Sequence, residues 1–270
     1  MIARERGFAL LIVLWTVGLI ALAVTRVVAA SRSEAQIAGN MHVAAVAEAT
    51  ADGAIHQATF RLLAGDWRAD RLPHLVRIGG GLAEVRVENL AGRVNPNMVP
   101  LAVMRQVLVG LGASPNQAAG IAEAMQDWRT PGEDPLPLGA KAPQYRAAGL
   151  AYVPTGRPFR SVEEIGLVLG MTPALLAALA PHVSVFMEGE TDPTLADPLL
   201  ARAIAAADIP LAPAPVQPDS TRPVLIVEII ADTLDRGRSI FTRRAIVRFA
   251  AVSRSNPVPW RILAWDSPGE

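Results

Sequence analysis

The chain has 270 residues, 51% of them hydrophobic, and its 25 basic residues balance its 25 acidic residues to a formal net charge of zero. This balance argues against a nucleic-acid-binding protein. The absence of cysteine excludes disulfides and thiolate metal sites, so an ordinary core must stabilise the fold.

The N-terminal segment predicts a membrane anchor. A short charged head ends at Gly7, and the run Phe8–Thr25 then has no charged residue over 18 positions, which is the length expected of a membrane-spanning helix. Extended to Ala30, this helix would measure about 35 Å at about 1.5 Å per residue. Because Arg4 and Arg6 precede it, the positive-inside rule places the N-terminus in the cytoplasm and the bulk of the chain across the membrane.

Two alternatives compete for this segment. It could be an ordinary signal anchor that is never cleaved. It could also be a secretory signal removed after Ala30, because the small residues before Ser31 satisfy the rule for leader removal. Such cleavage would release an exported soluble binding protein or hydrolase. The apolar stretch is longer than the usual core of about 7–15 residues, which favours a retained helix.

The next elements are a helix and a hairpin. Helical periodicity continues through Ser31–Leu63, and Gly65 is a suitable terminator. The segments Leu75–Ile78 and Val85–Glu88 then flank a triple glycine, which predicts a β-hairpin.

The middle of the chain is helical, with one long loop. We expect a loop over Arg129–Pro158, which is long enough to need a function or a feature that holds it. The predicted elements around it are helices over Met98–Leu111, Ser114–Trp128, Ser161–Leu169, Thr172–Leu179 and Thr194–Ala207, and a short strand over Val183–Phe186.

A proline-rich linker, Ile209–Pro223, precedes three predicted strands, Val224–Ala231, Ser239–Val252 and Trp260–Trp265. The early and late strand groups are each too small for a stable sheet. We therefore predict an α+β fold, in which a long N-terminal transmembrane helix packs on one antiparallel sheet and a large α-helical domain is inserted between the strands.

This organisation divides the chain into six parts. They are a leader (1–7), a transmembrane helix (8–30), a helix extension with the first strands (31–96), the inserted helical domain (97–207), the linker (208–222) and the C-terminal strands (223–270).

Several motifs carry a family resemblance. The junction RERG-FALLIVLW resembles the prepilin-type signal of pilins and type II secretion pseudopilins. The segments ENLAGRVNPN, DWR, LGA, FRSVEEI and VLGMTP, together with the helical insertion, resemble the minor pseudopilin K family of type II secretion. The linker and the segment Glu188–Asp197 match that family poorly.

The resemblance implies a role without catalysis. Prepilin peptidase would cut between Gly7 and Phe8, and the processed helix would hold the protein in the bacterial inner membrane with its bulk in the periplasm. The protein would then be a structural subunit at the tip of the type II secretion pseudopilus, taking part in initiation of its assembly and in protein secretion. Its partners would be the other minor pseudopilins in a tip complex and the major pseudopilin.

Position 12 agrees with this subtype. Most pilin-like proteins carry glutamate at the fifth mature position, and here that position is Ile12. In the family, the glutamate is thought to pair with the terminal amine of a neighbouring subunit, and a tip subunit has no neighbour above it. Any membrane helix also prefers isoleucine to an unpaired carboxylate, so Ile12 supports the subtype once the family is accepted.

An acidic cluster is a candidate calcium site. Asp127, Glu133 and Asp134 offer oxygen ligands near Gly132, and calcium tolerates such irregular loops. This cluster resembles the acidic loops of the helical domain that K-type subunits use for calcium. It departs from the family at Thr130, where the family often has a second aspartate. The alternative is a solvated acidic loop without metal.

No catalytic motif accompanies these features. HExxH, GxSxG and P-loop patterns are absent from the sequence. The C-terminal strands are basic, which predicts either a solvated sheet face or a contact with acidic partner subunits. The arginines concerned are Arg236, Arg238, Arg243, Arg244, Arg248, Arg254 and Arg261.

Overall fold

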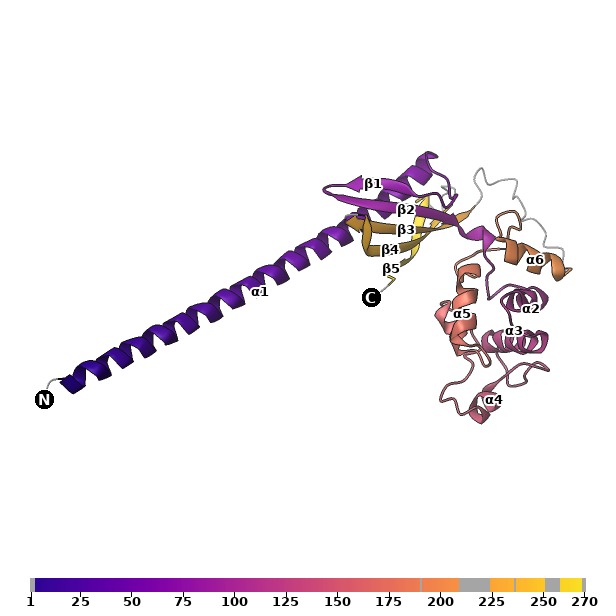
Figure 1. Cartoon of the computed structure of the whole chain (residues 1–270). Coiled ribbons are helices and arrows are strands. Elements are labelled where there is room, and N and C mark those ends of the chain that lie inside the picture. The colour runs from indigo at the N-terminus through magenta and orange to yellow at the C-terminus, as the bar shows by residue number, and fades with distance from the viewer. Residues whose placement is uncertain (1–2, 190, 209–223, 236, 251–257, 269–270) are drawn as a thin grey trace.

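The computed structural model describes residues 3–189, 191–208, 224–235, 237–250 and 258–268, without the side chains of 3–10, 27–33 and 35. Figure 1 shows a long helix whose C-terminal part lies on an antiparallel sheet, with a separate group of short helices at the other end of that sheet. The α+β class with an antiparallel sheet and inserted helices is confirmed.

Helix α1 (Ala3–Ala64) is continuous through the predicted extension. It ends where predicted, because Gly65 adopts a positive φ of 79° and its N–H donates to the Leu62 carbonyl at 3.2 Å. The last third of α1 buries a face of small residues, including Ala51, Ala54 and Ala58, against the sheet. Small side chains allow the helix axis to lie close to the strands.

The sheet has the order β1-β2-β3-β4-β5, with every neighbouring pair antiparallel. The strands are β1 (His74–Ile78), β2 (Gly81–Asn89), β3 (Leu225–Asp235), β4 (Arg238–Phe249) and β5 (Trp260–Asp266). In the central pair, Val85 of β2 lies opposite Ala231 of β3. This pairing joins the early and late strands into one sheet, as predicted.

The close fit of α1 on the sheet depends on two glycines. A Cβ on Gly53 would lie 2.8 Å from a methyl group of Ile78, and a Cβ on Gly81 would lie 2.1 Å from the Thr50 hydroxyl. Gly53 lowers the intrinsic helix propensity of α1. Its position at this contact shows that packing against β1 outweighs that cost.

The inserted helical domain has its own core, separate from the core beneath α1. Its large buried side chains include Trp128, Tyr145, Met104, Leu108 and Ile165. The elements are η1 (Leu90–Gly92), α2 (Leu101–Gly110), α3 (Pro115–Arg129), α4 (Ala142–Ala147), η2 (Glu163–Leu167), α5 (Pro173–Leu179), η3 (Ala180–His182) and α6 (Pro198–Ala206), where η marks a 3₁₀ helix. Helix α3 largely coincides with the predicted range Ser114–Trp128, and Ser114 caps it by accepting from the Gln117 N–H at 3.3 Å.

Three local predictions in this domain were wrong. The expected loop over Arg129–Pro158 contains α4, and the expected helix Ser161–Leu169 is only the 3₁₀ turn η2. The Ser161 hydroxyl accepts from the Glu164 N–H at 3.4 Å, as in a helix cap, and the Glu164 carboxylate accepts from the Trp128 indole and from the Arg160 N–H. Val183–Phe186 forms a single bridge to Val94 and no strand.

The last helix and the linker also differ from expectation. Helix α6 begins at Pro198 and not at Thr194, because the Asp197 carboxylate accepts from the Leu199 and Leu200 N–H groups and sets the start there. The predicted linker Ile209–Pro223 lies outside the described residues.

Candidate functional site

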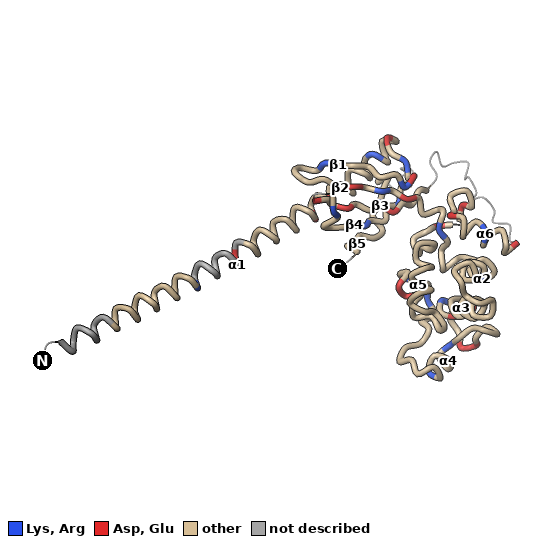
Figure 2. Tube along the Cα trace, viewed as in Figure 1, with Lys and Arg blue, Asp and Glu red and all other residues tan. Residues whose placement is uncertain are grey.

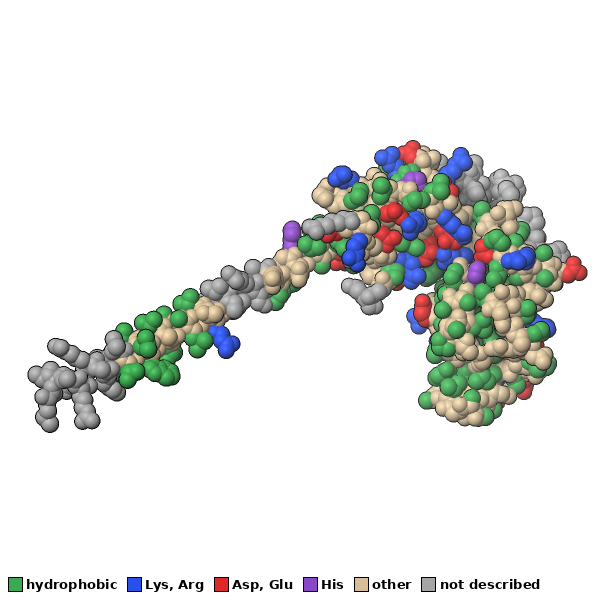
Figure 3. Space-filling model, in the orientation of Figure 1, with side chains coloured by type: hydrophobic (Ala, Val, Ile, Leu, Met, Phe, Trp, Pro, Cys, Tyr) green, Lys and Arg blue, Asp and Glu red, His purple; other side chains and the backbone are tan. Residues whose placement is uncertain are grey.

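Between Leu11 and Val24, α1 presents an apolar surface that no other described part of the protein covers. Figure 3 shows hydrophobic side chains along the projecting helix. Large apolar residues are more than half exposed over this stretch, among them Leu11, Val13, Leu14, Trp15, Leu19, Ile20 and Leu22. Such an apolar surface is suited to lipid or to packing against other helices.

The sequence-predicted residues of this segment fall within α1. The peptide bond between Gly7 and Phe8 lies inside the helix, and Ile12 is 50% exposed. Processing at Gly7 and the assembly role of position 12 stay predictions.

Among the residues that the structure describes, no helix combines the length and hydropathy needed to cross a membrane.

Arg243 of β4 fixes α1 on the sheet. Its side chain is only 9% exposed, and it donates to Asp52 at 2.7 Å and to Glu48 at 2.6 Å, both on α1. The guanidinium also lies over the rings of Phe241 and Trp265. Burial alone would lower the pKa of Arg243, but the hydrogen bonds to Asp52 and Glu48 outweigh it and raise the pKa above the usual range. The cation is therefore permanent.

Arg244, Arg248 and Arg261 lie on the other face of the sheet from Arg243. Arg244 lies near Asp266 at 3.4 Å, and Arg248 pairs with Glu188 at 3.1 Å, on the face opposite to α1. Figure 2 shows acidic and basic residues interspersed over the sheet. Arg244, Arg248 and Arg261 therefore share one face of the sheet, as the alternation predicts, and the first two are paired there with acidic side chains. Arg236 and Arg254 lie outside the described residues.

A second ion network joins the helical domain to the sheet. Arg93, which follows η1, bonds Glu88 of β2 at 2.9 Å and Glu228 of β3 at 2.6 Å. Glu228 is buried, so this pairing prevents an uncompensated charge at the junction. Burial lowers the pKa of Arg93, but the two glutamates outweigh that effect and raise it. Beside this network, Leu90, Ile226 and Ile246 form a small apolar cluster.

The acidic loop of the helical domain is held by hydrogen bonds within the chain. The Asp127 carboxylate accepts from the Leu136 N–H at 3.0 Å. The Lys141 ammonium, which is buried, donates to the backbone carbonyls of Asp127 at 2.7 Å and Thr130 at 2.5 Å. These carbonyls belong to the end of α3, where a cation is favourable. Burial raises the pKa of Asp127 despite these hydrogen bonds and the neighbouring Lys141.

The three predicted calcium ligands are placed differently from one another. Asp127 is buried, whereas Glu133 and Asp134 are exposed. Within the described ranges, the histidine, aspartate and glutamate side chains form no group of three or more that could hold a metal ion. Lys141 was not among the site residues predicted from the sequence. As the only lysine of the chain, it was a detectable signal.

Aromatic side chains support the loops around this region. The Trp128 indole lies parallel to the Phe159 ring and donates to Glu164 at 2.9 Å. The Tyr145 hydroxyl accepts from the Leu169 N–H at 2.9 Å. Burial of that phenol raises its pKa to about 12, so it stays neutral.

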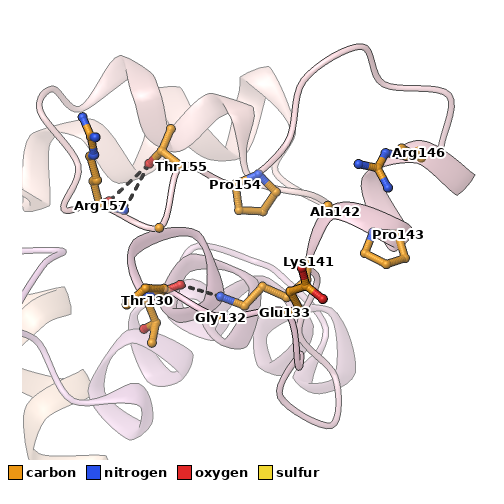
Figure 4. A pocket seen from close by; sticks show the side chains of 12 residues that line it. Thr130, Gly132, Glu133, Lys141, Ala142, Pro143, Arg146, Pro154, Thr155 and Arg157 are labelled. Atoms are coloured by element: carbon orange, nitrogen blue, oxygen red, sulfur yellow. Dashed lines mark hydrogen bonds between the residues drawn. The ribbon is translucent and has the colours of Figure 1, made fainter.

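These loops enclose a pocket of about 550 Å³, which Figure 4 shows from close by. Its lining comes from three segments, 130–133, 141–146 and 154–157. Three of the lining residues are basic (Lys141, Arg146 and Arg157) and one is acidic (Glu133).

Comparisons with known proteins converge on one family. Residues 85–188 match the family model described as "Type II secretion system (T2SS), protein K". Over 89 residues the chain is 36% identical to the type II secretion system protein K of Dickeya chrysanthemi, which covers 32% of this chain. The match spans 24% of that relative's length, about a quarter.

The fold is also similar to a solved structure, the crystal structure of the GspK-GspI-GspJ complex from the enterotoxigenic Escherichia coli type 2 secretion system. The TM-score is 0.57, with 14% sequence identity, and the match covers 89% of this chain and 99% of the other. At this identity the likeness establishes the fold.

Proposed function

We propose that this chain, whose residues 85–188 match the model of the type II secretion protein K family, is a structural minor pseudopilin that assembles at the tip of the type II secretion pseudopilus. It would take part in initiating pseudopilus assembly and so in protein secretion across the outer membrane. Its partners would be further minor pseudopilins, the I and J types named for the similar complex, and the major pseudopilin.

One observation carries the proposal. The helical domain is inserted between β2 and β3, two strands that pair directly. It projects beside the sheet, at the end away from the free part of α1 (Figure 1). A subunit with this bulk would clash if it were stacked repeatedly within a fibre, and a terminal position removes that conflict. This shape favours a structural role over catalysis.

The N-terminal half of α1 would be the anchor and then the assembly helix. The support is the uncharged run Phe8–Thr25 and the exposed apolar side chains between Leu11 and Val24. In this proposal, prepilin peptidase cuts after Gly7 on the cytoplasmic side of the inner membrane. Because position 12 is isoleucine and not glutamate, the helix has no carboxylate there that would need to pair with the amine of a neighbouring subunit.

Intact mass of the membrane-extracted protein tests processing. We expect a mature N-terminus at Phe8 and expect Gly7→Leu to block maturation. Gly18→Leu is the matched control, because Gly18 lies on the same helix with no atom near a new Cβ. A mature chain that begins at Ser31 would instead support the alternative, an exported soluble binding protein or hydrolase.

Co-expression tests assembly. We expect the full chain, extracted in detergent, to elute from size-exclusion chromatography together with its I-type and J-type minor pseudopilins. Elution of the chain alone, with partners that form their own complex, would contradict the proposal.

Calcium binding is a separate proposal, supported by the acidic residues Asp127, Glu133 and Asp134 at the loop. Titration calorimetry and melting curves with calcium and with chelator test it. The site would be supported if the wild type binds calcium and the Asp134→Asn variant does not. The proposal fails if there is neither heat nor a thermal shift.

A further inference from the structure

The pocket of the helical domain has a basic lining that its own carboxylates do not neutralise. Lys141, Arg146 and Arg157 oppose the single acid Glu133. Across the described residues, the Arg146 and Arg157 guanidinium groups have no ion pair. Two exposed guanidinium groups therefore keep all their donors for a ligand.

The floor of the pocket is a buried cation. Lys141 is 5% exposed, and its ammonium uses two N–H donors on the carbonyls of Asp127 and Thr130. An ammonium has three donors, so one remains beyond these two bonds. These hydrogen bonds hold the ammonium in place at the end of α3.

The walls of the pocket are preformed. Three prolines, Pro131, Pro143 and Pro154, restrict the lining segments. The Gly156 N–H donates to the Trp128 carbonyl at 2.9 Å, and Thr155 exchanges hydrogen bonds with the backbone of Arg157. A preformed site lowers the entropy cost of binding.

The arrangement of the charges selects the ligand. Figure 4 places Arg146 and Arg157 on opposite sides of the pocket, with Lys141 between them. Two separated guanidinium groups suit two separate carboxylates, because each can engage one carboxylate in a paired hydrogen bond. The volume of about 550 Å³ lies within the range of binding pockets, roughly 300–1,000 Å³.

We infer that this pocket binds an acidic segment of a partner protein, with at least two carboxylates spaced along an extended peptide. The prolines offer apolar surfaces for the peptide backbone between the carboxylates. Figure 1 shows α4 at the end of the helical domain farthest from the sheet, where a partner has free access. This inference does not rest on the role proposed for α1 or for assembly.

Fluorescence anisotropy with the full chain in detergent tests the inference. The probe is a fluorescein-labelled peptide of sequence Gly-Asp-Glu-Asp-Glu-Gly, and its neutral counterpart is Gly-Asn-Gln-Asn-Gln-Gly. We expect saturable binding of the acidic peptide, at least tenfold tighter than the neutral one, that weakens with added salt.

The variants locate the site. We expect Arg146→Gln with Arg157→Gln to weaken binding at least tenfold. The matched control is Arg77→Gln with Arg105→Gln, which removes the same charge from exposed positions outside the pocket and should change binding less than twofold. Circular dichroism melting of each variant confirms that it is folded.

Three results would overturn the inference. They are equal binding by the pocket double variant and the wild type, equal binding of the neutral peptide, and competition by succinate as potent as by the peptide. The last result would make the site a small-anion site. Loss of complex formation with the other pseudopilins would not affect this measurement, so the two proposals fail independently.

Discussion

Arg243 is a buried charged residue in the core beneath α1, and its ion pairs hold α1 on the sheet. Its neighbours two and four positions along β4, Ala245 and Val247, are fully buried on the same face of the sheet. An arginine there is stable because Glu48 and Asp52 come from the facing turns of α1 and neutralise it. One side chain thus sets how α1 is positioned along the sheet.

We expect Arg243→Met to lower the free energy of unfolding by about 2 kcal/mol, the scale of lost hydrogen bonds to charged groups. The cost stays moderate because Glu48 and Asp52 are partly exposed and can be hydrated again. Denaturant unfolding measures the change. Arg77→Met on β1 is the control and should change stability little; equal effects of the two variants would contradict the anchoring role.

Asp197 makes stability depend on pH. Burial raises the pKa of this carboxyl, but hydrogen bonds from the Leu200 backbone and from His182 outweigh burial, so the pKa lies below the usual aspartate range. A lowered folded pKa stabilises the protein above the unfolded value, about 3.9, and this stability is lost as the pH falls through the folded pKa.

We therefore expect the melting temperature to fall from about pH 4 downward and to fall less in Asp197→Asn, which keeps the helix cap without titrating. Thermal melts across this range measure the difference. Asp235→Asn at an exposed strand end is the control and should follow the wild type. If the melting temperature of Asp197→Asn fell with pH as steeply as that of the wild type, the Asp197 carboxyl would not be the source of the pH dependence.

At the scale of elements, close backbone contacts fix how the short segments dock. A Cβ on Gly92 of η1 would lie 2.3 Å from the Leu195 carbonyl oxygen, which is backbone and cannot rotate away. Nearby, the Asp192 N–H donates to the Ala91 carbonyl at 2.8 Å. The segment before α6 is thus held against η1 at the start of the insertion.

We expect Gly92→Ala to cost about 2 kcal/mol of stability, as overpacking a tight contact does. Gly80→Ala in the hairpin turn is a matched control, because a Cβ there meets no atom within 4 Å. Denaturant unfolding compares the two. An unchanged stability in Gly92→Ala would show that the Leu195 segment moves freely.

At the scale of the whole molecule, two cores are joined by a narrow junction. The helical core and the core beneath α1 share no residue, and the cluster between them has three buried members, Leu90, Ile226 and Ile246. Arg93 supplies the ionic link through Glu88 and Glu228. Coupling between the two cores therefore depends on few contacts.

We expect calorimetry to resolve two unfolding transitions, since cooperativity follows the extent of shared contacts. Arg93→Met should separate the transitions further, because it leaves the buried Glu228 without its closest cation. Arg105→Met, on the exposed face of α2, is the control. A single transition in both variants would contradict the division into two cores.

The candidate site was only partly predictable. Asp127 stood out in the sequence as part of an acidic cluster with Glu133 and Asp134. The cation that contacts the backbone carbonyls of Asp127 and Thr130 is Lys141, which lies beyond that cluster. Of the pocket charges, Arg146 belongs to an unrecognised helix, α4, and Arg157 belongs to the loop that follows that helix. A helix of six residues carries too little periodicity to be detected.

The sequence by itself determined the long helix that ends before Gly65, the glycine-turned hairpin, the helices that start after Ser114 and Thr172, and the α+β class. These features rest on residues within a few positions of one another, so local periodicity and turn chemistry suffice. Only the tertiary structure decided that Arg243 faces α1, that Arg93 joins the domain to the sheet, and that three separate segments, one of them containing α4, form one basic pocket. The physical reason is that burial and charge pairing depend on neighbours far apart in the chain, such as Glu48 and Arg243.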